Sequence, residues 1–111
     1  MKIRTQIAPG ICNFDAVVIA YTEDDQNVTF EFISECEIIK EFGRRVNEIS
    51  PVDAVATLGP EENPILSRAR KLLQTKGCCD ACVVPAGTVK IMQIAAGLAL
   101  PKDVSLTITQ E

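Results

Sequence analysis

Cysteine is the residue through which this sequence could do soft-metal or nucleophilic chemistry, because it contains five cysteines and no histidine. The missing histidine excludes Ser-His-Asp triads, Cys-His pairs, histidine-based zinc enzymes and haem held by histidine. Thiolates alone can still bind Zn²⁺, iron or an iron–sulfur cluster. We therefore examined where the cysteines fall relative to the predicted helices and strands.

The cysteines lie at predicted junctions between elements rather than inside them. Cys12 follows a Pro-Gly pair in the first connection, and Cys36 lies in the first turn of a helix, where the helix dipole favours a thiolate. Cys79 and Cys82 form a C-x-x-C pair whose sulfurs fit one tetrahedral centre. These positions predict a four-sulfur metal site made of Cys12, Cys36, Cys79 and Cys82, with Cys78 and Asp15 as substitute ligands.

Two other uses of the same thiols stay open. A structural zinc module would use the metal to fix the loops of a protein-interaction domain. A thiol redox protein would use Cys79 and Cys82, although a predicted helix, not the strand typical of thioredoxin-like proteins, precedes this pair. We expect a binding role rather than catalysis, with an iron–sulfur cluster or Zn²⁺ as the bound group.

The first third of the chain has the pattern of a three-stranded antiparallel meander. Residues 2–8 and 28–33 alternate apolar and polar side chains, and residues 15–22 form a short β-branched run. The polar stretch at residues 23–27 predicts a hairpin loop between the second and third strands. Cys12 would then lie in the first connection of this sheet.

The remainder of the chain has helical periodicity. A capping box with Ser34 as N-cap and Glu37 at N3 predicts a helix through Ile49. Three further helices are predicted over residues 51–58, from 63–64 to 77, and from Pro85 or Thr88 to residue 100. Alternation at Val104, Leu106 and Ile108 predicts a final strand that returns to the sheet. The expectation is a single α+β domain over residues 1–111, ordered βββ-αααα-β, with helices on one sheet face.

Composition limits the classes of partner. With 11 basic and 15 acidic residues the net charge is −4, which argues against nucleic acid and anionic membranes. The longest apolar run, residues 16–21, is far too short to span a bilayer, and no signal peptide precedes it. We therefore expect a cytoplasmic protein whose thiols stay reduced. Acidic residues concentrate in residues 1–63 and basic residues in 64–111, which is compatible with a homodimer or a protein partner.

The cysteine placement resembles that of the NifU/IscU iron–sulfur scaffolds and of the related domain appended to some ribonucleotide reductases. The resemblance spans residues 5–98 and implies a nascent cluster or Zn²⁺ on Cys12, Cys36 and Cys82. Phe14 stands where the scaffolds have their ligand aspartate, and Ala81 where they have histidine before the third cysteine. Their L-P-P-V-K docking segment is also missing, since residues 74–78 read QTKGC, and Cys79 would replace the missing ligand.

The segment from Cys82 to Val104 carries a second resemblance. Its C-x-V-P and G-L-A-L-P-x-D-V motifs are similar to those of uncharacterised small cysteine-containing proteins of anaerobic prokaryotes. That likeness implies no activity. The function predicted from the sequence is a metal-binding or iron–sulfur domain with a scaffold, carrier or electron-transfer role.

Overall fold

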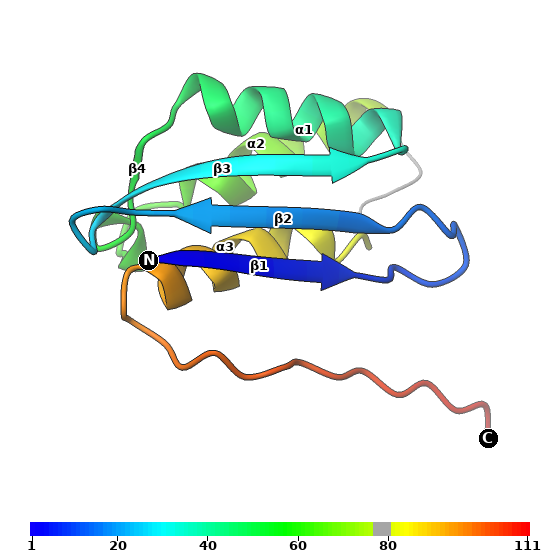
Figure 1. Ribbon diagram of the computed structural model, residues 1–111. Coiled ribbons are helices and arrows are strands. Elements are labelled where there is room, and N and C mark those ends of the chain that lie inside the picture. Colours follow the sequence, from blue (N-terminus) through cyan, green and yellow to red (C-terminus); the bar gives the residue numbers. More distant parts are fainter. Residues whose placement is uncertain (77–80) are drawn as a thin grey trace.

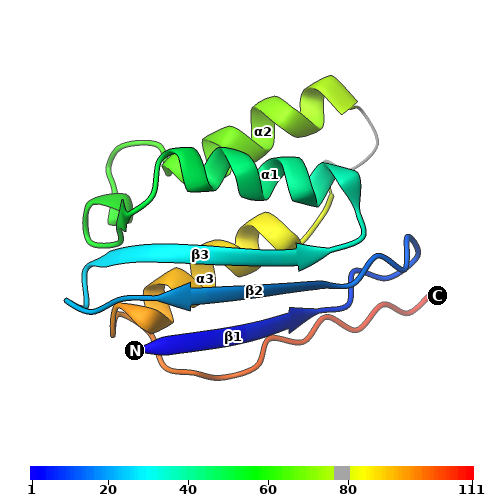
Figure 2. The same ribbon diagram turned by 45° about the horizontal axis from the view of Figure 1, so that its top comes forward.

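The computed structural model describes residues 1–76 and 81–111 and shows an α+β fold in two layers. A twisted antiparallel sheet forms one layer, and the helices cover one of its faces (Figure 1). The opposite face is free of helices, as Figure 2 shows from a second direction. The strands are β1 (Lys2–Ile7), β2 (Ala16–Tyr21), β3 (Asn27–Ser34) and the short β4 (Val52–Asp53), in the order β1-β2-β3-β4.

The strand register confirms the predicted meander. Ile7 pairs with Ala16 and Ala16 with Ser34, so the last residues of β1 and β3 lie at the same end of the sheet. The alternating pattern follows from burial: Ala16, Val18 and Ala20 of β2 lie beneath the helices, and the residues between them face the open side. The predicted boundaries of these three strands lie within one residue of the observed ones, because alternation is a local property of a half-buried strand.

The first helix, α1 (Glu37–Glu48), begins later than the capping box predicts. Cys36 occupies the N-cap position, and Ser34 is still part of β3, held there by its pairing with Ala16. The Ser34 hydroxyl accepts a hydrogen bond from the Cys36 N–H at 3.1 Å instead of capping the helix interior. The predicted N-cap assignment is therefore wrong by two residues.

The predicted helix over residues 51–58 is also wrong. The chain there forms β4 and a short 3₁₀ turn, η1 (Ala56–Leu58). Val52 pairs with Val28, and the Ala54 N–H donates to the Gln26 carbonyl at 2.8 Å, which commits these residues to the sheet edge. The Asp53 carboxylate then accepts the N–H groups of residues 55 and 56, so the cap belongs to a single turn.

Two further helices complete the helical layer. α2 (Pro64–Lys76) starts as predicted, with the Asn63 side chain accepting the N–H groups of residues 65 and 66. α3 (Val84–Ala95) lies behind β1 and β2 and ends before the predicted residue 100. Gly97, at φ +77°, ends it in a Schellman motif, in which the Gly97 and Leu98 N–H groups reach back to Ile94 and Gln93.

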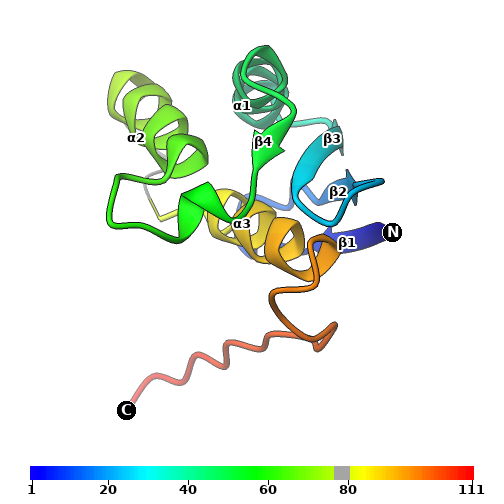
Figure 3. The same cartoon turned by 90° about the vertical axis from the view of Figure 1, so that its left-hand side faces the viewer.

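The C-terminal segment is not the strand that the sequence predicts. Residues 101–111 have no regular structure, and all are exposed. Figure 3 shows this segment leaving the end of α3 and running clear of both layers. Within residues 1–76 and 81–111, the predicted four helices and returning strand are thus corrected to three α-helices, one 3₁₀ turn and a short internal fourth strand.

The core lies between the sheet and the helices. Its largest fully buried side chains are Phe42, Ile65, Leu72, Met92, Val18, Val28, Val46 and Val84. Phe32 of β3 and Phe42 of α1 make an edge-to-face ring contact at 5.5 Å, which fixes α1 on the strand. Among the described helices, none is long and apolar enough to cross a membrane.

Candidate metal centre

The candidate site lies at the end of the sheet where β1 and β3 terminate. Because Ile7, Ala16 and Ser34 stand side by side in the register, the β1–β2 connection and the β3–α1 junction leave the sheet at the same end. Cys12 belongs to that connection and Cys36 to that junction. The topology of the meander therefore brings two thiols 24 positions apart in the chain to one pole.

Cys12 lies at the tip of the β1–β2 connection. A turn closes there through the Asn13 N–H and the Gly10 carbonyl, 3.0 Å apart. Both residues have left-handed backbone conformations, with φ +97° at Gly10 and +57° at Asn13. Cys12 is a free, exposed thiol in this turn, and its neighbour Ile11 is fully exposed. The loop therefore presents the first thiol to solvent.

Cys36 is positioned by the hydroxyl group of Ser34. Ser34 Oγ donates to the Asp15 carbonyl at 3.0 Å and accepts from the Cys36 N–H at 3.1 Å. This one hydroxyl joins the β3–α1 junction to the start of β2, next to the loop that carries Cys12. Cys36 is half-buried against the core, and as N-cap it lies at the positive end of α1.

Cys82 is brought to the same end of the sheet by the start of α3. A Cβ atom on Gly87 would stand 2.7 Å from Cδ1 of Ile7, so the first turns of α3 lie against the last residue of β1. Cys82 comes two residues before α3 and packs half-buried against the core. Its sulfur accepts a hydrogen bond from the Val84 N–H, a backbone donor of the kind that supports thiolate ligands.

The pKa of Cys82 reflects its burial first and the other two thiols only second. Burial raises the pKa of Cys82 above its usual range, the Val84 N–H opposes this effect, and the charges of Cys12 and Cys36 raise the pKa further. A thiol responds to other thiolates only when they lie nearby in a poorly screened environment. Cys12 and Cys36 therefore lie near enough to add to the pKa of Cys82, although the three thiols come from three separate segments.

The remaining predicted ligands have different outcomes. Asp15 is exposed just before β2, and its backbone carbonyl is occupied by the Ser34 hydroxyl. Cys78 and Cys79 fall outside the described residues. Across residues 1–76 and 81–111, no three cysteine or carboxylate side chains are already gathered at metal-ligand spacing. The described thiols share a pole and an electrostatic environment without forming a closed coordination cage.

Two supporting residues were not identified as such from the sequence. The capping pattern predicts Ser34 as a helix cap, but its hydroxyl orients Cys36 instead. In the sequence, the signal for this role is the spacing of two residues between the serine and the cysteine. Gly87 is the second such residue, because its lack of a side chain lets α3 approach Ile7 of β1. The same contact sets the position of Cys82, which the sequence pattern did not indicate.

Comparisons with known proteins identify a family without assigning an activity. A model described as a family of unknown function (DUF6951) matches residues 3–108. No curated protein and no solved structure matches the chain. No match links it to the NifU/IscU scaffolds, so that resemblance remains one of architecture and cysteine placement.

Proposed function

Because the chain belongs to the DUF6951 family, whose function is unknown, we propose a function from its site: Cys12, Cys36 and Cys82 bind an iron–sulfur cluster or Zn²⁺. The domain would act as a scaffold, carrier or electron-transfer module in the reducing cytoplasm. The observation that carries the proposal is the convergence of three thiols from three separate segments on one end of the sheet.

The donor set suits such a centre chemically. Thiolates are the ligands preferred by Zn²⁺ and by iron–sulfur clusters. Neither centre needs water or carboxylate ligands in addition. Thiolates held near one another repel, and a cation among them removes that repulsion. Cys12 and Cys36 both contribute to the raised pKa of Cys82, which supports placing the three thiols near one another.

The exposure of Cys12 favours a delivery role over a structural one. Structural zinc sites are closed, with all four coordination positions taken by protein ligands. Here Cys36 and Cys82 pack against the core, and Cys12 lies on an exposed loop. A centre bound by these residues would have one open side, through which a partner could take or supply it. Cys79 stays a sequence-based prediction for a fourth ligand.

The test is anaerobic purification of the full chain followed by metal analysis, sulfide analysis and visible absorption, before and after reconstitution with Fe²⁺ and sulfide or with Zn²⁺. We expect about one centre per chain. Cys12→Ser, Cys36→Ser and Cys82→Ser should each lower the bound metal severalfold. Ile11→Ser changes the same exposed loop without removing a thiol and should bind normally.

Two outcomes contradict the proposal. A wild-type chain that stays colourless and metal-free after both reconstitutions would show that the thiols do not form a centre. Equal metal content in the wild type and in all three serine variants would show that the metal is bound elsewhere. Circular dichroism of each variant verifies that the fold is retained.

A further inference from the structure

The C-terminal segment carries the sequence pattern of a strand, but it pairs with none of the strands that the structure describes. Val104, Leu106 and Ile108 are 71%, 77% and 86% exposed, and the two residues between them are polar. Exposed apolar side chains at every second position are unfavourable in water. If the segment paired with the edge of a sheet, these side chains would join one face of that sheet and be covered there. Figure 1 shows the segment extended and apart from the sheet.

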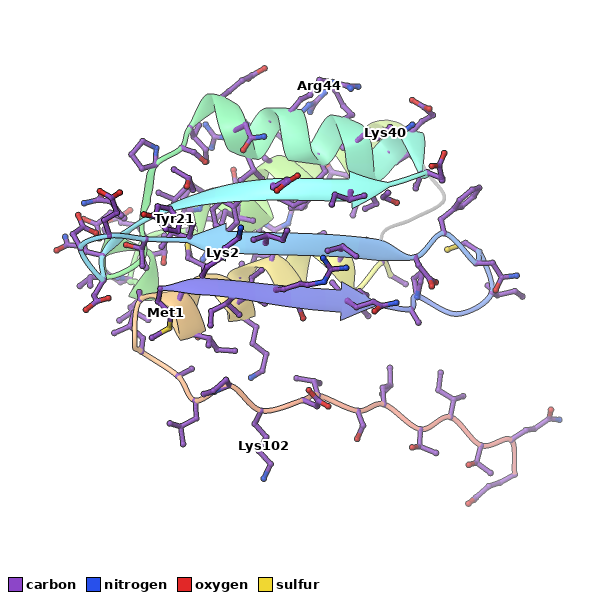
Figure 4. The ribbon with its side chains drawn as sticks, in the orientation of Figure 1. Met1, Lys2, Tyr21, Lys40, Arg44 and Lys102 are labelled. Atoms are coloured by element: carbon purple, nitrogen blue, oxygen red, sulfur yellow. The ribbon has the colours of Figure 1, made fainter. Side chains whose placement is uncertain are left out.

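The β1 strand offers an open edge. Among the described strands β1 pairs with β2 alone, so its outer backbone groups have no ladder partner. Ile3 and Ile7 on its helix-facing side are only partly buried, because the sheet ends there. Lys2 and Arg4 point to the opposite, open face, where Figure 4 shows Lys2 beside Tyr21.

We propose that residues 104–108 of one copy add as a fifth strand to the β1 edge of a second copy, and that the exchange is reciprocal. Two identical edges and two identical segments would then be covered in a closed twofold dimer. This inference does not depend on the thiols or on a bound metal.

The two faces of the added strand match those of β1. With the apolar side chains of residues 104, 106 and 108 turned toward the helices, they continue the row of Ile3 and Ile7 beneath α3. The other face of the segment then carries Ser105 and Thr107, with Asp103 directly before them, on the side where β1 presents Lys2 and Arg4. Strand alternation thus puts the apolar side chains of the added strand on the helix-facing side and its polar side chains on the side of Lys2 and Arg4.

The second copy is favoured over the molecule's own edge by the course of the chain. The Schellman turn at Gly97 and the following Pro101 direct the segment away from the sheet. In Figure 3 it runs clear of β1, and in Figure 4 the side chain of Lys102 points into solvent. A segment that projects from its own domain is placed to reach a neighbour, as in exchanges of identical elements between protomers.

The test measures the solution mass of the full chain by light scattering at micromolar to millimolar concentrations. We expect about twice the 12.1 kDa chain mass. Leu106→Asp places a charge on the apolar face and should raise the dimer dissociation constant by roughly tenfold or more. Ser105→Asp adds the same charge to the polar face one residue away and should leave the dimer largely intact.

The following results would overturn the proposed strand exchange or support it. A wild-type chain that is monomeric throughout would overturn the proposal, whether the segment folds onto its own β1 or serves another protein. A dimer that withstands Leu106→Asp as well as Ser105→Asp would show that a different surface holds the copies together. Hydrogen exchange supplies a second readout, since the amides of both β1 and residues 104–108 should be protected in the dimer and exposed in the Leu106→Asp variant.

Discussion

Gly43 of α1 lies against the ring of Phe32 of β3, so closely that a Cβ atom on Gly43 would stand 2.9 Å from two ring carbons. Phe32 in turn meets the ring of Phe42, one residue before Gly43 on the helix. The absence of a side chain at residue 43 therefore sets the distance between α1 and the sheet, and with it the position of the helix start that carries Cys36.

Gly43→Ala should destabilise the protein although alanine is the better helix former. Alanine gains about 1 kcal/mol in helix propensity, but the new methyl group overlaps a packed ring that cannot move freely. We expect a net loss of roughly 1–2 kcal/mol in the free energy of unfolding. Gly87→Ala is the matched comparison, because its contact is the flexible end of Ile7, and chemical denaturation of both variants measures the difference. Equal effects at the two glycines would contradict this account.

Asp24 organises the loop between β2 and β3. Its carboxylate accepts hydrogen bonds from the Asn27 side chain and from the backbone N–H groups of Asn27 and Gln26, which hold the pKa of Asp24 well below its usual range. The contribution of a carboxyl group with a lowered pKa is present above its unfolded pKa of about 3.9 and is lost as the pH falls toward the folded value.

Asp24→Ala should therefore lower the thermal stability at neutral pH and flatten its dependence on pH below about 4. Melting curves between neutral and acidic pH measure both effects. Asp25→Asn is the control, since it changes the neighbouring acid at a left-handed position that asparagine tolerates. If Asp24→Ala and the wild type lose stability in parallel on acidification, the carboxylate is not the source of the pH dependence.

Ser34 is a positioning residue for the candidate metal centre. Ser34→Ala removes the hydroxyl that joins the Asp15 carbonyl to the Cys36 N–H, and should cost about 1 kcal/mol of stability. Because the hydroxyl orients a ligand, we also expect metal affinity to fall by roughly 10-fold or more. Competition with a chromophoric chelator measures that affinity, and Ser34→Thr should restore it. Ser67→Ala, a serine of α2, should change neither quantity by a comparable amount, and unchanged affinity in Ser34→Ala would reduce Ser34 to a purely structural role.

The start of α2 depends on one side chain. Asn63 accepts the N–H groups of Ile65 and Leu66 at 2.9 and 3.3 Å, which would otherwise have no partner within the helix. Asn63→Ala should lower the free energy of unfolding by about 1 kcal/mol, and Asn63→Asp should retain most of it. Urea denaturation gives both values, and a loss in Asn63→Asp as large as in Asn63→Ala would argue against the cap.

The sequence predicted best what short-range patterns decide. The three long strands were located to within a residue, because alternation along β1, β2 and β3 records which face is buried. The helix predicted over residues 51–58 does not form, because a proline at the start of such a stretch is as compatible with entry into a sheet as with a helix start. At Val104, Leu106 and Ile108 the strand pattern is present but the partner is not, and pairing depends on a surface that the local sequence does not describe.

The candidate site was likewise only partly predictable from the sequence. The positions of Cys12, Cys36 and Cys82 at element junctions could be predicted from the sequence. Their common pole depends on the register of β1 with β2 and β3, and on the contact of Gly87 with Ile7, which are long-range facts. The role of Ser34 was hidden because the same residue type caps helices and bridges turns.

The open face of the sheet also provides an optical advantage. Tyr21 is the only tyrosine in a chain without tryptophan, and it lies on β2 at the end opposite Ala16, remote from the thiol pole. Its hydroxyl donates to Glu23 at 2.8 Å, so its ultraviolet signal reports on the far hairpin alone. Charge-transfer bands from sulfur to bound iron would therefore stand out against a nearly transparent polypeptide, and loading of the centre and the state of the far hairpin could be followed in one spectrum.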